Sequence, residues 1–178
     1  MKLIFRLPII ILKSKRGARI GLLDESVVDF RVLPNDCDLY FHMNNARYTN
    51  IAVLGRVYHL GKAGIDKTLL KRRWFPIIFA SETIHIKPIR PFKKYTLKTK
   101  MLTWDEKYWY FEHLFEINGL IHAINMTMGV MVCKGKIVPL SIVVGELGLF
   151  INPPELPDRV KKWKNLHEQL KVIHKKPG

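Results

Sequence analysis

The chain has 178 residues, 48% of them hydrophobic and 11% aromatic, which excludes a disordered protein and indicates one domain with a sizeable core. Its 30 lysines and arginines against 15 acidic residues give a net charge of +15, which favours an anionic partner such as nucleic acid, lipid head groups or a phosphate-bearing ligand. The two cysteines, Cys37 and Cys133, exclude a disulfide scaffold and favour free thiols in a reducing compartment.

Residues 1–13 are apolar with interspersed basic residues. The stretch is too short to span a bilayer and lacks a small-residue cleavage site, so a cleaved signal peptide is the weakest interpretation. The pattern predicts a buried strand or a docked arm. An interfacial membrane contact remains the alternative, helped by four basic residues, Lys13, Lys15, Arg16 and Arg19.

The next elements are a strand over 26–33 and a long helix over 45–62. Asn44 or Asn45 provides a good helix N-cap, and Gly61 and Gly64 are stop signals. Apolar residues at helical spacing predict one buried helix face, made of Val53, Leu54, Val57 and Leu60.

The rest of the chain reads as antiparallel strands followed by a helix. Alternating or β-rich patterns cover 74–89, 95–101, 109–117 and 124–132. Turn signals separate them at Asp105-Glu106 and at Asn118-Gly119, and 134–136 closes the last strand. A proline-rich turn over 152–157 precedes a basic amphipathic helix over 158–173. This order predicts an α+β architecture, with one long helix against a curved antiparallel sheet.

Two carboxylates, a histidine, two asparagines and a tyrosine occur within the segment 36–48, Asp-Cys-Asp-Leu-Tyr-Phe-His-Met-Asn-Asn-Ala-Arg-Tyr. The segment lies between the predicted strand and the start of the predicted long helix. The first N–H groups of a helix have no intrahelical partner. A reactive carbonyl at this place would therefore meet a carboxylate base and an oxyanion site together. Cys37 lies between two aspartates that raise its pKa, so it is a poor nucleophile.

This segment and the order of elements resemble the hotdog-fold thioesterases of the 4-hydroxybenzoyl-CoA thioesterase type. Matches to the family pattern of Asp-x-Asp followed by His-x-Asn-Asn-x-x-Tyr fall at Asp36, Asp38, His42, Asn44, Asn45 and Tyr48. Segments 42–48, 103–105 and 153–157 also look similar to the thioesterase superfamily member 6-like proteins. The resemblance implies a hotdog fold, with the sheet wrapped around the long helix and an added C-terminal helix. We expect an N-terminal arm (1–22), a hotdog domain (23–150) and a packed C-terminal segment (151–178).

The resemblance also implies roles for the residues of the motif. Asp38 maps onto the catalytic aspartate and acts either as nucleophile or as general base; the sequence leaves both open. The alternative for Asp38 is a structural one, a cap of the helix or of a turn. The backbone N–H near Asn45 donates to the thioester oxygen. His42 is a general acid for the leaving thiolate, a group that polarises the substrate, or a structural contact of the loop. The remaining expectations are structural: Asp36 orients the loop, Asn44 and Asn45 cap the helix, and Tyr48 packs in a pocket or interface.

Two features distinguish this chain from related enzymes. Many active members of the family have glycine just before the histidine, where this chain has Phe41, and we expect the bulky side chain to narrow the pocket. No acidic residue occurs between Asp38 and Asp66, which disfavours mechanisms that place a carboxylate on the long helix.

The predicted substrate is a coenzyme A thioester, with no other cofactor and no metal, because His85, His113 and His122 lack metal-ligand spacing. Cations at the pocket rim would bind the coenzyme A phosphates. The candidates are Arg72, Arg73, Lys87, Arg90, Lys93 and Lys94, with Lys134 and Lys136 in addition.

The sequence therefore predicts a cytoplasmic acyl-CoA thioesterase that acts as a homodimer or higher even oligomer. The alternative is a non-catalytic acyl-CoA or lipid-binding hotdog protein that contacts a membrane peripherally through the N-terminal arm. Nucleic-acid binding rests on charge alone, and we do not expect it.

Overall fold

The computed structural model of the protein describes residues 3–149 and 151–173. Helices are α1 (Leu3–Ser14), α2 (Asn45–Lys62), α3 (Asp66–Arg72), α4 (Leu140–Glu146) and α5 (Asp158–Ile173), and η1 (Pro34–Asp36) is one short 3-10 turn. Strands are β1 (Glu25–Arg31), β2 (Phe75–His85), β3 (Lys94–Trp104), β4 (Trp109–Ile117), β5 (Leu120–Cys133) and β6 (Lys136–Val138).

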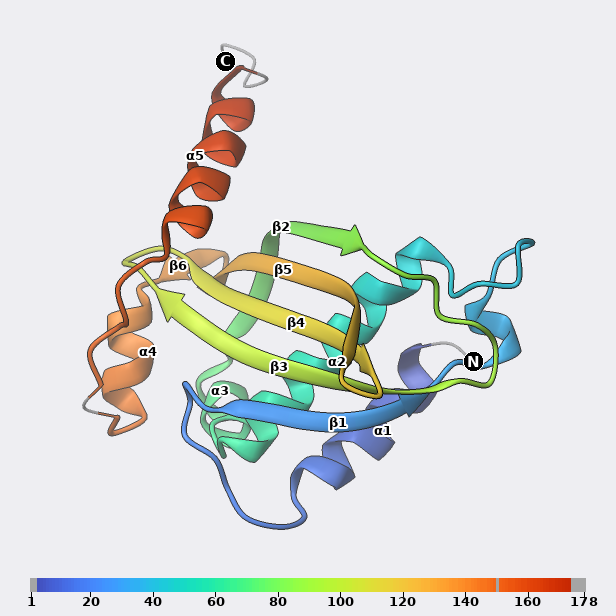
Figure 1. The fold of residues 1–178 in the computed structure, drawn as a ribbon. Helices are drawn as coiled ribbons and strands as arrows, with labels where there is room; N and C mark the ends of the chain where they lie inside the picture. Colours follow the sequence, from blue (N-terminus) through green and yellow to red (C-terminus); the bar gives the residue numbers. More distant parts are fainter. Residues whose placement is uncertain (1–2, 150, 174–178) are drawn as a thin grey trace.

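The strands form one antiparallel sheet in the order β1-β3-β4-β5-β2, with β6 paired to β5. The sheet curves around α2, which lies across its inner face, and α5 rises from the opposite side (Figure 1). This confirms the predicted α+β architecture of a curved sheet around one long helix. The bounds predicted for α2, β4 and α5 match the structure.

The helix α2 packs closely on the sheet because Gly55 faces β3. A Cβ atom at this position would lie 2.6 Å from Thr99 Oγ1 and 2.7 Å from Leu97 Cδ2. Buried Ile51 and Leu54 continue the contact toward the start of the helix and pack with Phe115 of β4. This contact holds the N-terminus of α2 in place beside the candidate site.

The predicted hairpin turn at Asn118-Gly119 forms as expected, with φ angles of 50° and 79°. Lys134 and Gly135, which join β5 to β6 in a hairpin that was not predicted, have φ angles of 48° and 77°. Two successive positive φ angles are those of a type I′ turn, whose twist matches that of the flanking strands. Both turns set the register of β5 against its neighbours.

The structure corrects the prediction of a strand near the N-terminus. Residues Leu3–Ser14 are helical, and Arg6, Ile10 and Ser14 are buried at a spacing of four residues. Contacts with α2 therefore override the strand propensity of the isoleucine run. The docked-arm alternative is confirmed in this form, since α1 packs against α2.

The sequence analysis also missed α3, α4 and β6. The two helices have seven residues each, too few to display a clear apolar period. Both helices are held by tertiary contacts, because Leu69 of α3 and Val143 of α4 belong to the same buried cluster. Within the described residues, no helix combines the length and the hydropathy needed to cross a membrane.

Candidate active site

The segment after β1, the first turn of α2 and the end of β2 enclose a pocket of about 340 Å³, which we call the loop pocket. Its lining consists of Asp38, Tyr40, His42, Met43, Asn45, Tyr48, His85, Ile86, Lys87 and Pro88. The structure thus brings together five of the residues that the sequence analysis selected: Asp38, His42, Asn45, Tyr48 and Lys87.

The two oxygens of Asp38 have different surroundings. Oδ1 accepts hydrogen bonds from the backbone N–H groups of Tyr40 (3.0 Å) and His42 (3.4 Å), which hold the loop in a tight turn. No hydrogen bond within the described residues engages Oδ2. One oxygen therefore positions the carboxylate, and the other remains free to accept a proton or attack a carbonyl carbon.

The start of α2 supplies a hydrogen-bond donor to the same pocket. Asn44 is the N-cap residue, and its Oδ1 accepts the N–H of Ala46 at 2.9 Å. Within the described residues, the N–H of Asn45 has no acceptor. An unpartnered N–H at the positive end of the helix dipole is suited to stabilise an oxyanion.

Tyr48 forms a buried wall of the pocket. Its ring meets those of His85 and Phe115 edge-on, with centroids 4.7 and 5.0 Å apart. Burial raises the pKa of its hydroxyl to about 12, so the group stays protonated at neutral pH. The side chain therefore contributes packing and shape.

Asp36 lies below the loop and is 2% exposed. Its Oδ2 pairs with the guanidinium of Arg6 from α1 and accepts the N–H of Leu33 at 2.9 Å. Arg47 of α2 lies 3.8 Å from Oδ1, and the Asn44 N–H donates to the Asp36 carbonyl at 2.9 Å. The carboxylate thus joins α1, the loop and α2, and the sequence analysis missed the contribution of Arg6.

Phe41 differs from its predicted role. Its side chain is 75% exposed and is not part of the pocket lining, so it does not narrow the loop pocket of this chain. Its backbone has a φ of 55°, a left-handed conformation that favours glycine. The cost of a large residue here is therefore backbone strain in the loop.

The predicted phosphate-binding cations divide into two groups. Lys87 lines the pocket, and the exposed Arg90, Lys93 and Lys94 follow it in the connection to β3. Arg72 and Arg73 end α3, at the opposite end of the sheet (Figure 1).

Cys37 has a raised pKa, as the sequence analysis expected. Burial is the main cause, and the charges of Asp36 and Asp38 add to it.

A second feature that the sequence analysis missed is a buried polar network between α2 and the sheet. Arg56 Nη1 donates to His113 Nε2 at 3.2 Å and to Thr127 Oγ1 at 2.9 Å. Thr127 in turn donates to Asn125 Oδ1 at 2.9 Å. Burial, followed by the charge of Arg56, lowers the pKa of His113 well below its usual range. A signal was present, because Arg56 interrupts the apolar face that includes Val53 and Val57.

The loop pocket has the parts needed for attack on a carbonyl group. The carboxylate of Asp38 supplies a base or nucleophile, and the start of α2 supplies an oxyanion donor. Among the residues that the structure describes, no group of three or more His, Cys, Asp or Glu side chains is placed to hold a metal ion.

Comparison with known proteins identifies the family and the fold. Residues 32–164 match the model of the thioesterase-like superfamily. Protein THEM6 from Xenopus laevis is 26% identical over 144 residues, which cover 80% of this chain and 68% of that protein. The Saccharomyces cerevisiae protein named "Probable thioesterase YBR096W" is 30% identical over 108 residues, 60% of this chain and 46% of that protein. The solved structure of a gentisyl-coenzyme A thioesterase shares the fold, with a TM-score of 0.62 and 19% identity over 67% of this chain and 99% of that chain.

The buried ion pair between α1 and the loop generates a stability prediction. Replacing Arg6 by methionine (Arg6→Met) leaves the buried Asp36 carboxylate without its main partner, and we expect a loss of about 3–5 kcal/mol in the free energy of unfolding. Urea unfolding at neutral pH measures this loss as a lower midpoint.

Lys15→Met is the matched control, because Lys15, the residue after α1, also pairs with an acid, Asp66, but at a partly exposed position. We expect this substitution to cost at most about 1 kcal/mol. Equal losses in the two variants would contradict a special role for Asp36.

Proposed function

The chain belongs to the thioesterase-like superfamily and is therefore a thioester hydrolase, and we propose that it hydrolyses an acyl-CoA to a free acid and coenzyme A. The observation that supports this substrate most directly is the loop pocket, where the Asp38 carboxylate and the start of α2 line one space. Lys87 at the pocket and the basic residues after it provide cations for the coenzyme A phosphates.

In the proposed reaction, Asp38 takes a proton from a water molecule, and the resulting hydroxide attacks the thioester carbon. Negative charge on the carbonyl oxygen is stabilised by the free N–H of Asn45 at the positive end of α2. The carbon–sulfur bond then breaks, and the thiolate of coenzyme A takes up a proton, with His42 as the proposed donor.

Direct attack by Asp38 is the second route to the same products. It would form a mixed anhydride and release coenzyme A, after which water would cleave the anhydride. The unengaged Oδ2 of Asp38 serves either route.

The proposal predicts that Asp38→Asn abolishes turnover, because the amide neither accepts the proton nor attacks the carbonyl carbon. We expect a loss of about a hundredfold or more, measured as free thiol released from short, long and aromatic acyl-CoAs. Asp158→Asn, on the exposed start of α5, removes the same charge and should leave the rate unchanged.

Full activity in folded Asp38→Asn would refute the role of this residue. An inactive wild-type protein across the panel would refute the substrate class. It would favour a non-catalytic acyl-CoA binder if the same ligands raised the melting temperature.

We further propose that the enzyme is a homodimer joined along β2. Within the described residues, β2 pairs only with β5, so its other edge is free. Large apolar side chains remain exposed on this edge strand and just after it: Phe75, Ile77, Ile78, Ile84 and Ile86. An apolar free edge is a template for pairing with a second copy. Because Ile86 also lines the loop pocket, such a dimer would place the site at the subunit interface.

The dimer proposal predicts that Ile84→Lys yields monomers in sedimentation equilibrium, because the charge opposes pairing of the two edges. Val27→Lys is the control on the opposite edge strand, where the residue is similarly exposed, 48% against 51% for Ile84. The mass of this control should equal that of the wild-type dimer. A monomeric wild type, or a dimer disrupted by Val27→Lys alone, would contradict the use of β2.

A second candidate function is the binding of acyl-CoA or lipid at a membrane surface. In this candidate, a cytoplasmic protein contacts the membrane peripherally, and the binding does not require turnover. The supporting observation is the outer face of α1, where Phe5, Ile9 and Leu12 are exposed. The basic residues Lys13, Lys15, Arg16 and Arg19 lie at its end or follow it. Exposed apolar residues beside cations are typical of helices that lie in the interface of an anionic membrane.

This candidate predicts that the full chain co-sediments with phosphatidylserine-containing vesicles and less with pure phosphatidylcholine. Ile9→Asp should lower the affinity for the vesicles about tenfold, since it removes one aliphatic side chain that the membrane would bury. Leu120→Asp changes a similarly exposed leucine on the β4–β5 hairpin and should have no effect. Equal binding of both variants would rule out α1 as the contact.

A further inference from the structure

A second cavity, separate from the loop pocket, lies between the later turns of α2, the inner face of the sheet, α3 and α4. It has a volume of about 150 Å³, and apolar side chains dominate its lining. Cavities of this size and character remain dry and take up small apolar molecules. Nucleotides and peptides are excluded, because pockets for larger ligands measure about 300–1,000 Å³.

The cavity contains one cation, the guanidinium of Arg56. Arg56 is buried, and no acidic side chain within the described residues forms an ion pair with it. Burial lowers its pKa to about 10, so the group remains charged at neutral pH. A buried charge without a counter-ion is costly, which points to an anion that the chain itself does not supply.

The hydrogen bonds of Arg56 show which edge of its guanidinium is available to bind an anion. A guanidinium has five N–H donors, and Nη1 uses its two on His113 and Thr127. The three donors on Nε and Nη2 have no acceptor in the part of the chain that the structure describes. These atoms form the fork that binds a carboxylate through two parallel hydrogen bonds.

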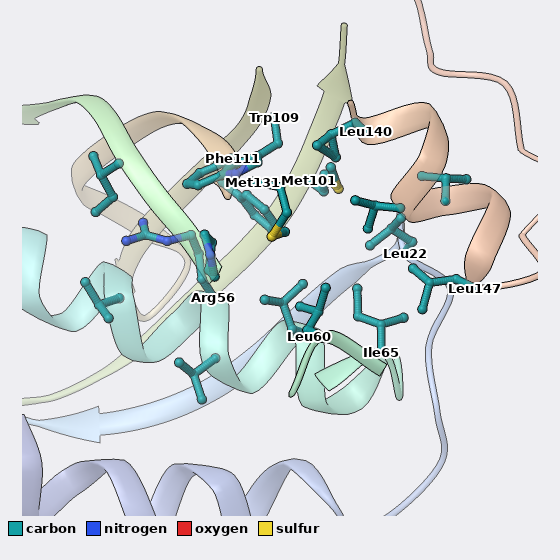
Figure 2. A pocket seen from close by; sticks show the side chains of 17 residues that line it. Leu22, Arg56, Leu60, Ile65, Met101, Trp109, Phe111, Met131, Leu140 and Leu147 are labelled. Carbon is teal, nitrogen blue, oxygen red and sulfur yellow. The ribbon is translucent and has the colours of Figure 1, made fainter. Parts of the chain in front are cut away.

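Trp109 adds a fourth unpartnered donor to the three on Arg56. Its ring lies beneath the guanidinium, with 5.8 Å between Arg56 Cζ and the ring centroid, and it lines the cavity. Its Nε1 is buried without a hydrogen-bond partner. Figure 2 shows the guanidinium at one end of the cavity and the apolar side chains of Leu140 and Leu147 at the other. The cavity thus has a polar end for a head group and an apolar end for a tail.

We propose that this cavity binds a short-chain fatty acid, with its carboxylate on the free edge of Arg56 and its aliphatic tail between α3 and α4. The ligand belongs to the same chemical class as the acid that acyl-CoA hydrolysis releases. The site is nevertheless distinct from the loop pocket, and binding does not depend on turnover.

The test is calorimetric titration of the full chain with hexanoate and with hexan-1-ol, which has a similar tail but no charge. We expect saturable binding of hexanoate, weakened about tenfold or more in Arg56→Gln, and no matching loss for the alcohol. Arg159→Gln is the control for net charge, because it removes an arginine from the surface of α5 and should leave hexanoate binding unchanged.

A second variant keeps the proposal testable if Arg56→Gln does not fold. Val143→Phe fills the apolar end of the cavity from α4 and should abolish hexanoate binding with Arg56 intact. Absent binding of hexanoate to the wild type, or equal binding to all variants, would overturn the proposal. If the wild type binds no hexanoate and its dimer dissociates on Arg56→Gln, the partner subunit supplies the counter-ion instead.

Discussion

The buried carboxylate of Asp36 is the interaction on which the arrangement of the candidate site depends. The carboxylate forms an ion pair with Arg6 of α1 and accepts the N–H of Leu33. The backbone carbonyl of Asp36 accepts the N–H of Asn44 at the start of α2. A carboxylate in this position is stable only with these partners, because an unpaired charge in a protein interior costs several kcal/mol. One residue, through its side chain and its backbone carbonyl, therefore fixes the N-terminal helix, the loop and the first turn of α2 relative to one another.

This arrangement separates two carboxylates that are two residues apart. Asp36 is enclosed by cations and amides, whereas Asp38 uses one oxygen to hold the turn and keeps the other in the loop pocket. The same segment thus supplies structural support and chemistry. The helix start adds the N–H of Asn45, which lines the pocket and has no acceptor among the described residues. The proposed reaction needs no acid on the long helix, and the chain has none between Asp38 and Asp66.

The core of the fold contains a second charged group, Arg56, whose hydrogen-bond donors are only partly satisfied. Arg56 lies between α2 and the sheet, where two of its five N–H donors bond to His113 and Thr127. The other three donors have no acceptor among the described residues. Gly55, its neighbour, lets the helix approach β3 closely enough for this network to form. The fold therefore holds two polar centres at different parts of α2: one accessible at its N-terminus and one enclosed by apolar side chains farther along it.

The sequence by itself determined the elements with strong local patterns. The 18 residues of α2, the alternation in β4 and the Asn118-Gly119 turn are local in origin, and their positions agree with the structure. The Asp36–Tyr48 motif also located the loop pocket, because its residues are consecutive in the chain. Only the tertiary structure decided that residues 3–14 form a helix, that Arg6 pairs with Asp36, and that Arg56 meets His113. These contacts join residues 30 and 57 positions apart, and their energies come from burial and charge pairing that no local pattern encodes.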